Sequence, residues 1–332
     1  MTTPLEDLRS GWERQQSVHE PDRELRFRLM LDYIEHLTDP PRRVLDLACG
    51  PGSITRRVLD RFPSAEVAAL DIDPLLLELA RDAFAGNERI RVVARQLAEA
   101  GWWEDLGRFD AVLTATAMHW LPPSALSGVY AGVARLLRPG GIFANADHMP
   151  LADPVLRDAA DGMHAEYLRE IFASGVESCD EWYRRAYADP RYEGWWAERE
   201  RVFAHWTGEL LESEEWHLGL LRRSGFERAG VVWRRGNDAL VIAVRGQAHP
   251  APGSSVDRAP GRAHGLEDRG YRRMSERGGI VTDHPDEHPS ATEPDELLVD
   301  DLIDETRLPE EGPPEVRETA DGVSPSSPEP PA

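Results

Sequence analysis

The 332-residue chain contains no lysine, and all 38 of its basic residues are arginine. This absence excludes a P-loop, whose lysine reaches the nucleotide phosphates, and it excludes a lysine that forms a Schiff base or acts as a general base. The only cysteines are Cys49 and Cys179, too few for a zinc site made of cysteines alone. No run approaches the roughly 18 uninterrupted apolar residues of a membrane span.

Charge and proline divide the chain into two regions. Residues 248–332 hold 20 acidic and 8 basic residues, 13 of the 26 prolines and one aromatic residue, Tyr271. Such a composition is typical of a disordered tail. We therefore predict a folded domain over 1–247 and an acidic, proline-rich tail over 248–332. Within the tail, residues 294–308 carry apolar side chains that either fold on a partner or are solvated.

The net charge and the N-terminal sequence limit which partners and which cellular compartment we expect. The formal charge is −22, and binding to nucleic acid requires clustered cations, so no nucleic-acid partner is expected. The N-terminus lacks the basic and apolar segments of a secretory signal peptide. We expect a cytoplasmic protein that binds no membrane and no metal, and that is a monomer or a weak homodimer.

From residue 43 onward, short apolar strands alternate with helical patterns. This alternation predicts a parallel sheet with helices on both faces. The predicted strands lie at 43–48, 65–72, 90–95, 109–117 and 142–147, and the predicted helices at 22–38, 53–62, 74–84 and 123–137.

Residues 151–210 interrupt the alternation. They show helical periodicity and many aromatic residues but no strand pattern, which predicts a helical insertion that covers the edge of the sheet. A helix follows at 213–224, with Ser213 as its N-cap. Two further strands are predicted at 226–235 and 238–246. The Gly236-Asn237 dipeptide between them favours a tight turn that joins antiparallel strands.

The stretch "RRVLDLACGPGS" (42–53) places a glycine-bearing loop after the first strand. Parallel sheets bind ligands at the carboxyl ends of their strands, so this loop indicates a nucleotide-like ligand. A dinucleotide requires G-x-G-x-x-G, and Thr55 stands where the third glycine belongs. The carboxylate of Asp46 would oppose a pyrophosphate, which also disfavours an NAD-dependent oxidoreductase. That carboxylate either faces a ligand with a cationic end, such as S-adenosylmethionine, or caps the following turn.

Several segments in order resemble the motifs of class I S-adenosylmethionine-dependent methyltransferases. "VLDLACGPGS" (44–53) is similar to motif I, with Gly50 and Gly52 matching and Ala48 in place of the first glycine. The other similar segments are "AALDIDP" (68–74), "VVARQLAE" (92–99), "FDAVLTATAMHWL" (109–121) and "RLLRPGGIFAN" (135–145). The resemblance covers roughly residues 22–246. It implies a doubly wound, mostly parallel seven-stranded α/β sheet, Rossmann-like, with the last strand antiparallel.

The resemblance also implies an enzyme with S-adenosylmethionine as cofactor. Asp71 would accept hydrogen bonds from both ribose hydroxyls, and a helix-capping role can coexist with that contact. Gln96 stands where the family often has an aspartate near adenine, and an amide can both donate and accept there. The implied cofactor contacts are Asp46, Ala48, Gly50, Gly52, Asp71, Ile72, Gln96, Leu97 and Ala115. A protein that binds the cofactor without catalysis, as a sensor or partner, is the alternative.

The sequence signals for the methyl acceptor are less specific than those for the cofactor. "TATAMHW" lacks the N-P-P-[YFW] motif of nucleic-acid methyltransferases, which favours a small organic acceptor methylated on oxygen or nitrogen, a carboxylate included. His119 is the candidate base, or else a structural histidine. Trp120, Asp147 and His148 either contact substrate or pack and pair with their neighbours. "MHWLPP" followed by "LLRPGG" is similar to the group of small-molecule methyltransferases that includes trans-aconitate methyltransferases.

Overall fold

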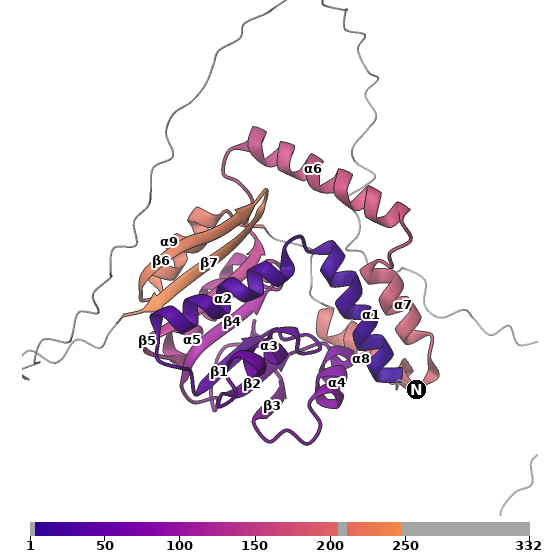
Figure 1. Cartoon of the computed structure of the whole chain (residues 1–332), viewed down its shortest axis with the longest axis horizontal. Coiled ribbons are helices and arrows are strands. Elements are labelled where there is room, and N and C mark those ends of the chain that lie inside the picture. Colours follow the sequence, from indigo (N-terminus) through magenta and orange to yellow (C-terminus); the bar gives the residue numbers. More distant parts are fainter. Residues whose placement is uncertain (1–3, 205–210, 247–332) are drawn as a thin grey trace, which may run out of the picture. The chain divides into compact units, whose positions relative to one another are not determined.

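The computed structural model describes residues 4–204 and 211–246. Within these residues, seven strands form one sheet in the order β3-β2-β1-β4-β5-β7-β6 (Figure 1). Strand β7 is antiparallel to β5 and to β6, and the other neighbouring strands are parallel, which confirms the predicted fold. The strands are β1 (Arg43–Leu47), β2 (Glu66–Asp71), β3 (Ile90–Ala94), β4 (Phe109–Ala115), β5 (Leu137–His148), β6 (Phe226–Arg235) and β7 (Asp238–Arg245).

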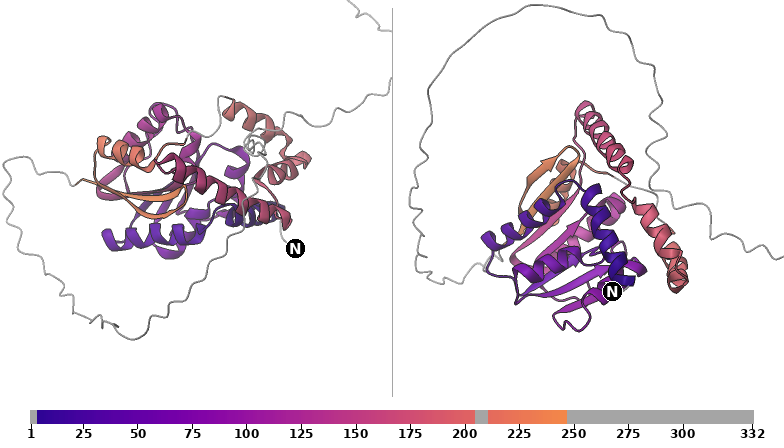
Figure 2. Two further views of the ribbon diagram at one scale, coloured as in Figure 1. Left: turned by 90° about the horizontal axis from the view of Figure 1, so that it is seen from above. Right: turned by 45° about the vertical axis from the view of Figure 1, so that its right-hand side comes forward.

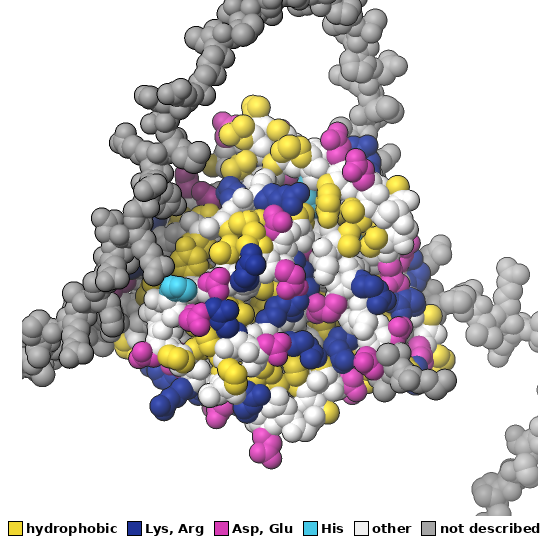
Figure 3. Space-filling model, viewed as in Figure 1, with side chains coloured by type: hydrophobic (Ala, Val, Ile, Leu, Met, Phe, Trp, Pro, Cys, Tyr) yellow, Lys and Arg dark blue, Asp and Glu magenta, His cyan; other side chains and the backbone are white. Residues whose placement is uncertain are grey.

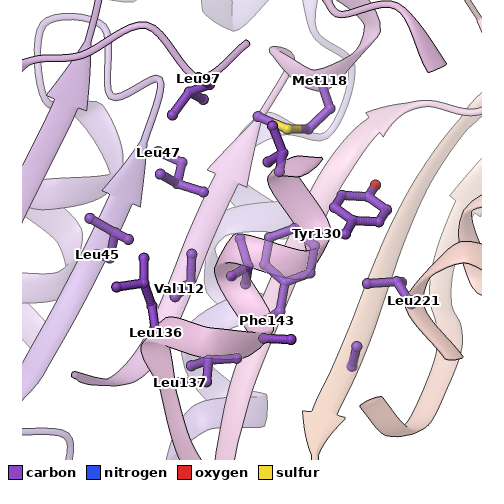
Figure 4. Packing of buried hydrophobic residues seen from close by; sticks show 14 of the residues in the cluster. Leu45, Leu47, Leu97, Val112, Met118, Tyr130, Leu136, Leu137, Phe143 and Leu221 are labelled. Atoms are coloured by element: carbon purple, nitrogen blue, oxygen red, sulfur yellow. The ribbon is translucent and has the colours of Figure 1, made fainter. Parts of the chain in front are cut away.

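Helices cover both faces of the sheet because successive strand residues point to opposite faces. Val44 of β1 packs with Met30 of α2 (Arg23–Leu37) and Val58 of α3 (Ser53–Arg61) on one face. Leu45 and Leu47 pack on the other, in the cluster that includes α5 (Pro123–Leu136) and α9 (Glu214–Arg223). Figure 4 shows this second cluster, with Leu45, Leu47 and Val112 beside Leu136 and Phe143.

Strand β5 begins five residues earlier than the sequence predicts, at Leu137 instead of 142. Leu137 pairs with Phe109 before the register shifts, so the proline–glycine stretch is part of the strand. A Cβ atom on Gly141 would lie 2.9 Å from the carbonyl oxygens of Arg138 and Asp110. Glycine is therefore required at this position, because a side chain there would collide with backbone atoms.

The N-terminal helix α1 (Pro4–His19) is an element that the sequence interpretation did not include. Leu5, Leu8 and Trp12 follow helical spacing, and Glu6 and Asp7 lie in the first turn, so the signal is present. Its apolar face joins a separate cluster with α4 (Pro74–Ala83), which follows β2.

The insertion forms α6 (Pro154–Ala173), α7 (Cys179–Tyr187) and α8 (Glu193–Phe203). It does not cover the sheet's edge as predicted: α7 packs on α1, and α8 packs on α4. The Tyr167 hydroxyl of α6 donates to the carbonyl oxygen of Val18, and the Asn237 side chain donates to the carbonyl oxygen of Arg157. Helix α6 thus runs from the β6–β7 turn to the end of α1 (Figure 2).

The β6–β7 hairpin and the N-cap of α9 match the sequence expectation. Gly236 has φ +55° at the β6–β7 turn, and the Ser213 side chain accepts a hydrogen bond from the Trp216 amide at the start of α9. On the face in Figure 3, acidic and basic side chains are interspersed among the coloured residues. No helix in the described ranges is long and apolar enough to cross a membrane. The predicted tail, 248–332, lies outside the described residues.

Candidate functional site

The glycine loop leaves the carboxyl end of β1 in a left-handed backbone conformation. Ala48, Gly50 and Gly52 have φ values of +52°, +54° and +90°. A Cβ atom on Gly52 would lie 2.3 Å from the Phe84 ring. Ala48, where the family motif has glycine, adopts a conformation that disfavours an L side chain. The loop geometry therefore explains why glycine recurs in this motif.

Asp46 fixes the start of α3. Its Oδ2 accepts hydrogen bonds from the Thr55 amide at 2.9 Å and the Thr55 hydroxyl at 2.6 Å. Its Oδ1 is buried and has no hydrogen-bond partner within the described residues. Burial raises the pKa of Asp46 to about 7, although the two bonds from Thr55 oppose the rise. The capping alternative is thus realised through Oδ2, and Oδ1 retains its acceptor capacity.

Asp71 at the end of β2 supports the same loop. Its Oδ2 accepts from the Gly50 amide at 2.8 Å, and its Oδ1 accepts from the amides of Ile72 and Asp73 at 2.7 and 2.8 Å. Burial raises the pKa of this carboxyl to about 6. The helix cap next along the chain is Asp73, which accepts from the Leu75 amide. An ionised carboxylate offers about four lone-pair sites, so Asp71 can still accept bonds from a ligand.

Helix α1 lies over the glycine loop. A Cβ atom on Gly50 would lie 4.0 Å from the Trp12 indole. Glu13 accepts a hydrogen bond from the Ser53 hydroxyl and pairs with Arg23 at 2.8 Å. These contacts join α1 to the first turn of α3.

The remaining predicted cofactor residues lie at neighbouring strand ends. Gln96 is half-buried just after β3, where its Oε1 accepts from the Ala98 amide at 3.3 Å. Leu97 packs in the apolar cluster beside Leu47 and Met118 (Figure 4). Ala115 is half-buried at the end of β4.

His119 and Asp147 form a buried pair between the ends of β4 and β5. The His119 Nδ1 lies 2.5 Å from Asp147 Oδ1, and Asp147 Oδ2 accepts from the Met118 amide at 2.7 Å. Burial alone would raise the pKa of Asp147, but His119, His148 and His217 lower it to about 2. The ionised carboxylate holds the imidazole proton on Nδ1, so that Nε2 is the acceptor nitrogen of the neutral ring and donates only when the ring is protonated.

His148 lies beside this pair and contacts two further carboxylates. The two imidazole ring centroids are 4.7 Å apart, His148 Nδ1 lies 2.6 Å from Asp238 Oδ1, and Nε2 lies 3.8 Å from Glu20 Oε1. Burial lowers the pKa of His148, but Asp238 and Glu20 raise it to about 10. His148 is therefore protonated at neutral pH.

Backbone strain marks the same strand end. Thr116, directly after β4, has φ +47°, and its amide donates to the Ala146 carbonyl oxygen at 2.8 Å. A β-branched residue in the left-handed region is an outlier, and such strain concentrates at functional sites. The half-buried Trp120 follows, with its ring 4.6 Å from that of His119.

Two further residues, Trp182 and Cys49, have structural roles. Trp182 is fully buried among Leu8 and Leu75, so it packs in a core. Cys49 is buried, and burial raises its thiol pKa well above the usual range. Glu20, Asp238 and Asp73 were not predicted, because each makes its site contacts with residues distant in sequence.

Known proteins are similar to the part of the chain that contains the glycine loop, Asp71 and His119. Residues 44–141 match the family model of the methyltransferase domain. A trans-aconitate 2-methyltransferase from Methylobacterium radiotolerans is 36% identical over 137 residues, which are 41% of this chain and 46% of that protein. A second one, from Streptomyces avermitilis, is 27% identical over 195 residues, which are 52% of this chain and 71% of that protein.

Residues 44–141 are similar to methyltransferase domains. The predicted resemblance to class I S-adenosylmethionine-dependent methyltransferases is confirmed by this match and by the named relatives. The solved structure of an O-methyltransferase family protein from Burkholderia thailandensis is 19% identical, covers 74% of this chain and 72% of that one, and has a TM-score of 0.45.

The matched range contains only part of the candidate site. Asp46, the glycine loop, Asp71 and His119 lie inside residues 44–141. The residues around His119 lie outside this range. Asp147 and His148 belong to β5, and the partners of His148 are Asp238 of β7 and Glu20, directly after α1. The first relative is matched over less than half of its length, so its acceptor does not follow from the family.

Proposed function

We propose that this protein binds S-adenosylmethionine at the carboxyl ends of β1 and β2 and transfers its methyl group to a small carboxylic acid. The observation that carries the proposal is the convergence of the Asp46 Oδ1 atom, the left-handed glycine loop and the Asp71 carboxylate at one end of a methyltransferase-type sheet. Bound S-adenosylmethionine supplies a methyl group activated by a sulfonium.

The residues present suit that cofactor. A buried carboxylate oxygen without a partner, at Asp46, favours a ligand with a cationic end. Gly50 and Gly52 keep side chains out of the loop and permit close backbone approach. The Gly50, Ile72 and Asp73 amides occupy three of the roughly four lone-pair sites of Asp71, so about one remains for a ribose hydroxyl. Gln96 presents an amide at the end of the next strand. Ala48, Ile72, Leu97 and Ala115 complete the proposed cofactor contacts.

On the acceptor side, His119 is the proposed catalytic residue. Asp147 orients its ring, and the neighbouring His148 carries a positive charge that attracts an anionic acceptor. A carboxylate oxygen is already nucleophilic, so alignment matters more than proton removal in its methylation. His119 then serves as a hydrogen-bond partner that positions the acceptor. Trp120 and His148 are proposed acceptor contacts. The names of the two curated relatives, which specify trans-aconitate, support an acid.

A methyl-transfer assay with the full chain tests this function. Radiolabelled S-adenosylmethionine is incubated with trans-aconitate, simple di- and monocarboxylic acids, phenols and amines. The expected result is labelled product from one or more acids, and its release by mild alkali identifies an ester. Labelling of amines or phenols alone contradicts the acid acceptor. Cofactor binding without turnover of any compound favours the non-catalytic alternative.

A further inference from the structure

Gln15 on the inner face of α1 is a buried amide that folding does not explain. Its exposed fraction is 1%, and among the described residues neither its Oε1 nor its Nε2 atom has a hydrogen-bond partner other than the Cys179 thiol. Its neighbour Cys179, at the start of α7, offers only a weak thiol. Leaving a buried polar group unpaired costs about 1–3 kcal/mol. A methionine would fill the same space without that cost, so the amide suggests a ligand-binding role.

The position of Gln15 along α1 lies between the two parts of the methyltransferase site. Trp12, one turn earlier, lies over Gly50 of the glycine loop. Glu20, directly after the helix, reaches His148 beside His119. With a rise of about 1.5 Å per residue, Gln15 is about 4.5 Å along the helix axis from Trp12 and about 7.5 Å from Glu20. Along the helix axis, Gln15 therefore lies between the residue over the glycine loop and the residue that reaches His148.

The next turn of α1 presents a second polar atom of the same kind. His19 lies four residues after Gln15, so the two side chains share a face of the helix. Among the residues that the structure describes, its Nε2 is buried without a hydrogen-bond partner, and its ring centroid lies 5.1 Å from that of Phe172. Burial lowers the pKa of His19 against the opposing charge of Glu20, so the ring is neutral at neutral pH. Gln15 and His19 together offer uncharged donors and acceptors.

We propose that Gln15, assisted by His19, determines acceptor specificity by binding a second carboxyl group of a di- or tricarboxylic acid. The inference rests on the proposed function, because it names the substrate class of the same site. A primary amide and an imidazole N–H donate to the two oxygens of a carboxylate, and the amide oxygen accepts from a protonated acid. A site built to hydrogen-bond a substrate group discriminates strongly against analogues that lack it.

The Gln15→Met substitution tests this role because it keeps the side-chain volume and removes both polar atoms. We expect the KM for trans-aconitate to rise about 10-fold or more, with kcat changed far less. The melting temperature should stay the same or increase, since an unpaired buried amide is removed. The dissociation constant for S-adenosylhomocysteine should be unchanged. Gln16→Met, at the half-buried neighbouring glutamine, is the matched control and should leave all three quantities unchanged.

Three results would overturn the inference. An unchanged KM excludes Gln15 from acceptor binding. A fall in melting temperature shows that the amide is structural, and an equal loss of S-adenosylhomocysteine affinity assigns it to the cofactor. Gln15→Leu provides a second apolar variant if Gln15→Met does not fold. Failure of the proposed function is separate: in that case the unsubstituted chain methylates no acid, and the acceptor role of Gln15 falls with it.

Discussion

Asp46 combines two tasks through its two oxygen atoms. Oδ2 holds Thr55 and so fixes the start of α3, whereas Oδ1 is buried without a partner. A fully paired carboxylate would stabilise the fold more, because an unpaired buried charge is costly. The raised pKa of Asp46, about 7, expresses this cost. At the residue scale, the site therefore sacrifices stability at the position proposed to face the cationic end of the cofactor.

Asp46→Asn should change the pH dependence of stability. The native state holds the Asp46 proton more tightly than the unfolded chain, so Asp46 lowers stability as pH rises from about 4 to about 7. Asparagine keeps an acceptor for Thr55 and does not titrate. We expect the stability of the variant relative to the unsubstituted chain to increase by more than about 1 kcal/mol from pH 5 to pH 8, measured by urea unfolding.

Asp110→Asn is the control for this experiment. Burial raises the pKa of Asp110, but bonds from the Arg43 and Arg42 amides and from Arg138 lower it below its usual value. Its contribution to stability is present above the unfolded pKa and is lost only as pH falls through the lower folded pKa. The control should shift stability by a constant amount from pH 5 to pH 8. Parallel pH profiles for Asp46→Asn and the unsubstituted chain would contradict the account of Asp46.

At the scale of elements, α7 and α8 are both joined to the carboxyl end of β2 through one carboxylate. Asp73 Oδ2 accepts from the Tyr183 hydroxyl of α7 at 3.0 Å and from Arg199 Nε of α8 at 2.9 Å. The Arg199 guanidinium also lies 4.2 Å from the Tyr183 ring centroid. Since the Asp73 amide donates to Asp71, the inserted helices connect directly to the proposed ribose contact.

Arg199→Met should loosen α8 without unfolding the sheet. The substitution removes a largely buried charge-assisted hydrogen bond and leaves Asp73 with fewer partners. We expect the amide hydrogens of α8 to exchange about 10-fold faster or more, while those of β1 and β4 are unchanged. Arg201→Met is the matched control, because Arg201 pairs only locally with Glu198 on the same helix. Equal exchange in the two variants would contradict the fastening role of Arg199.

Sequence patterns predict the elements of the sheet well because proline, glycine and apolar runs are local signals. The predicted helix at 53–62 and strand at 226–235 agree with α3 and β6 within one residue. Helix α1 was not predicted, although the helical spacing of Leu5, Leu8 and Trp12 is a local signal for it. The early start of β5 depends on pairing with Phe109, which is a tertiary contact.

The candidate site shows the same division between local and tertiary information. Strand-end residues such as Asp71, His119 and Asp147 can be predicted, because the carboxyl ends of parallel strands meet at one edge. Asp238 cannot be predicted from one sequence as the partner of His148, because the two residues are 90 positions apart. The two roles of Asp46, as a cap and as a proposed ligand contact, also cannot be predicted without knowing where Thr55 lies in the fold.

At the scale of the whole molecule, the charge is −22 and no lysine is present. These properties and the interspersed surface charges in Figure 3 agree with a small-molecule acceptor, although they identify none. Helix α6 carries three strongly exposed hydrophobic side chains, Val155, Leu156 and Met163. The prediction that 248–332 is a separate tail stays a prediction.

Titration calorimetry of the full chain with S-adenosylhomocysteine tests the central claim most directly. The account predicts saturable binding of one molecule per chain, with NADH binding far more weakly because Asp46 opposes a pyrophosphate. Asp71→Ala should weaken S-adenosylhomocysteine binding by at most about 3 kcal/mol, the scale of charge-assisted hydrogen bonds. Absence of S-adenosylhomocysteine binding by the unsubstituted chain, or tighter binding of NADH, would contradict the account.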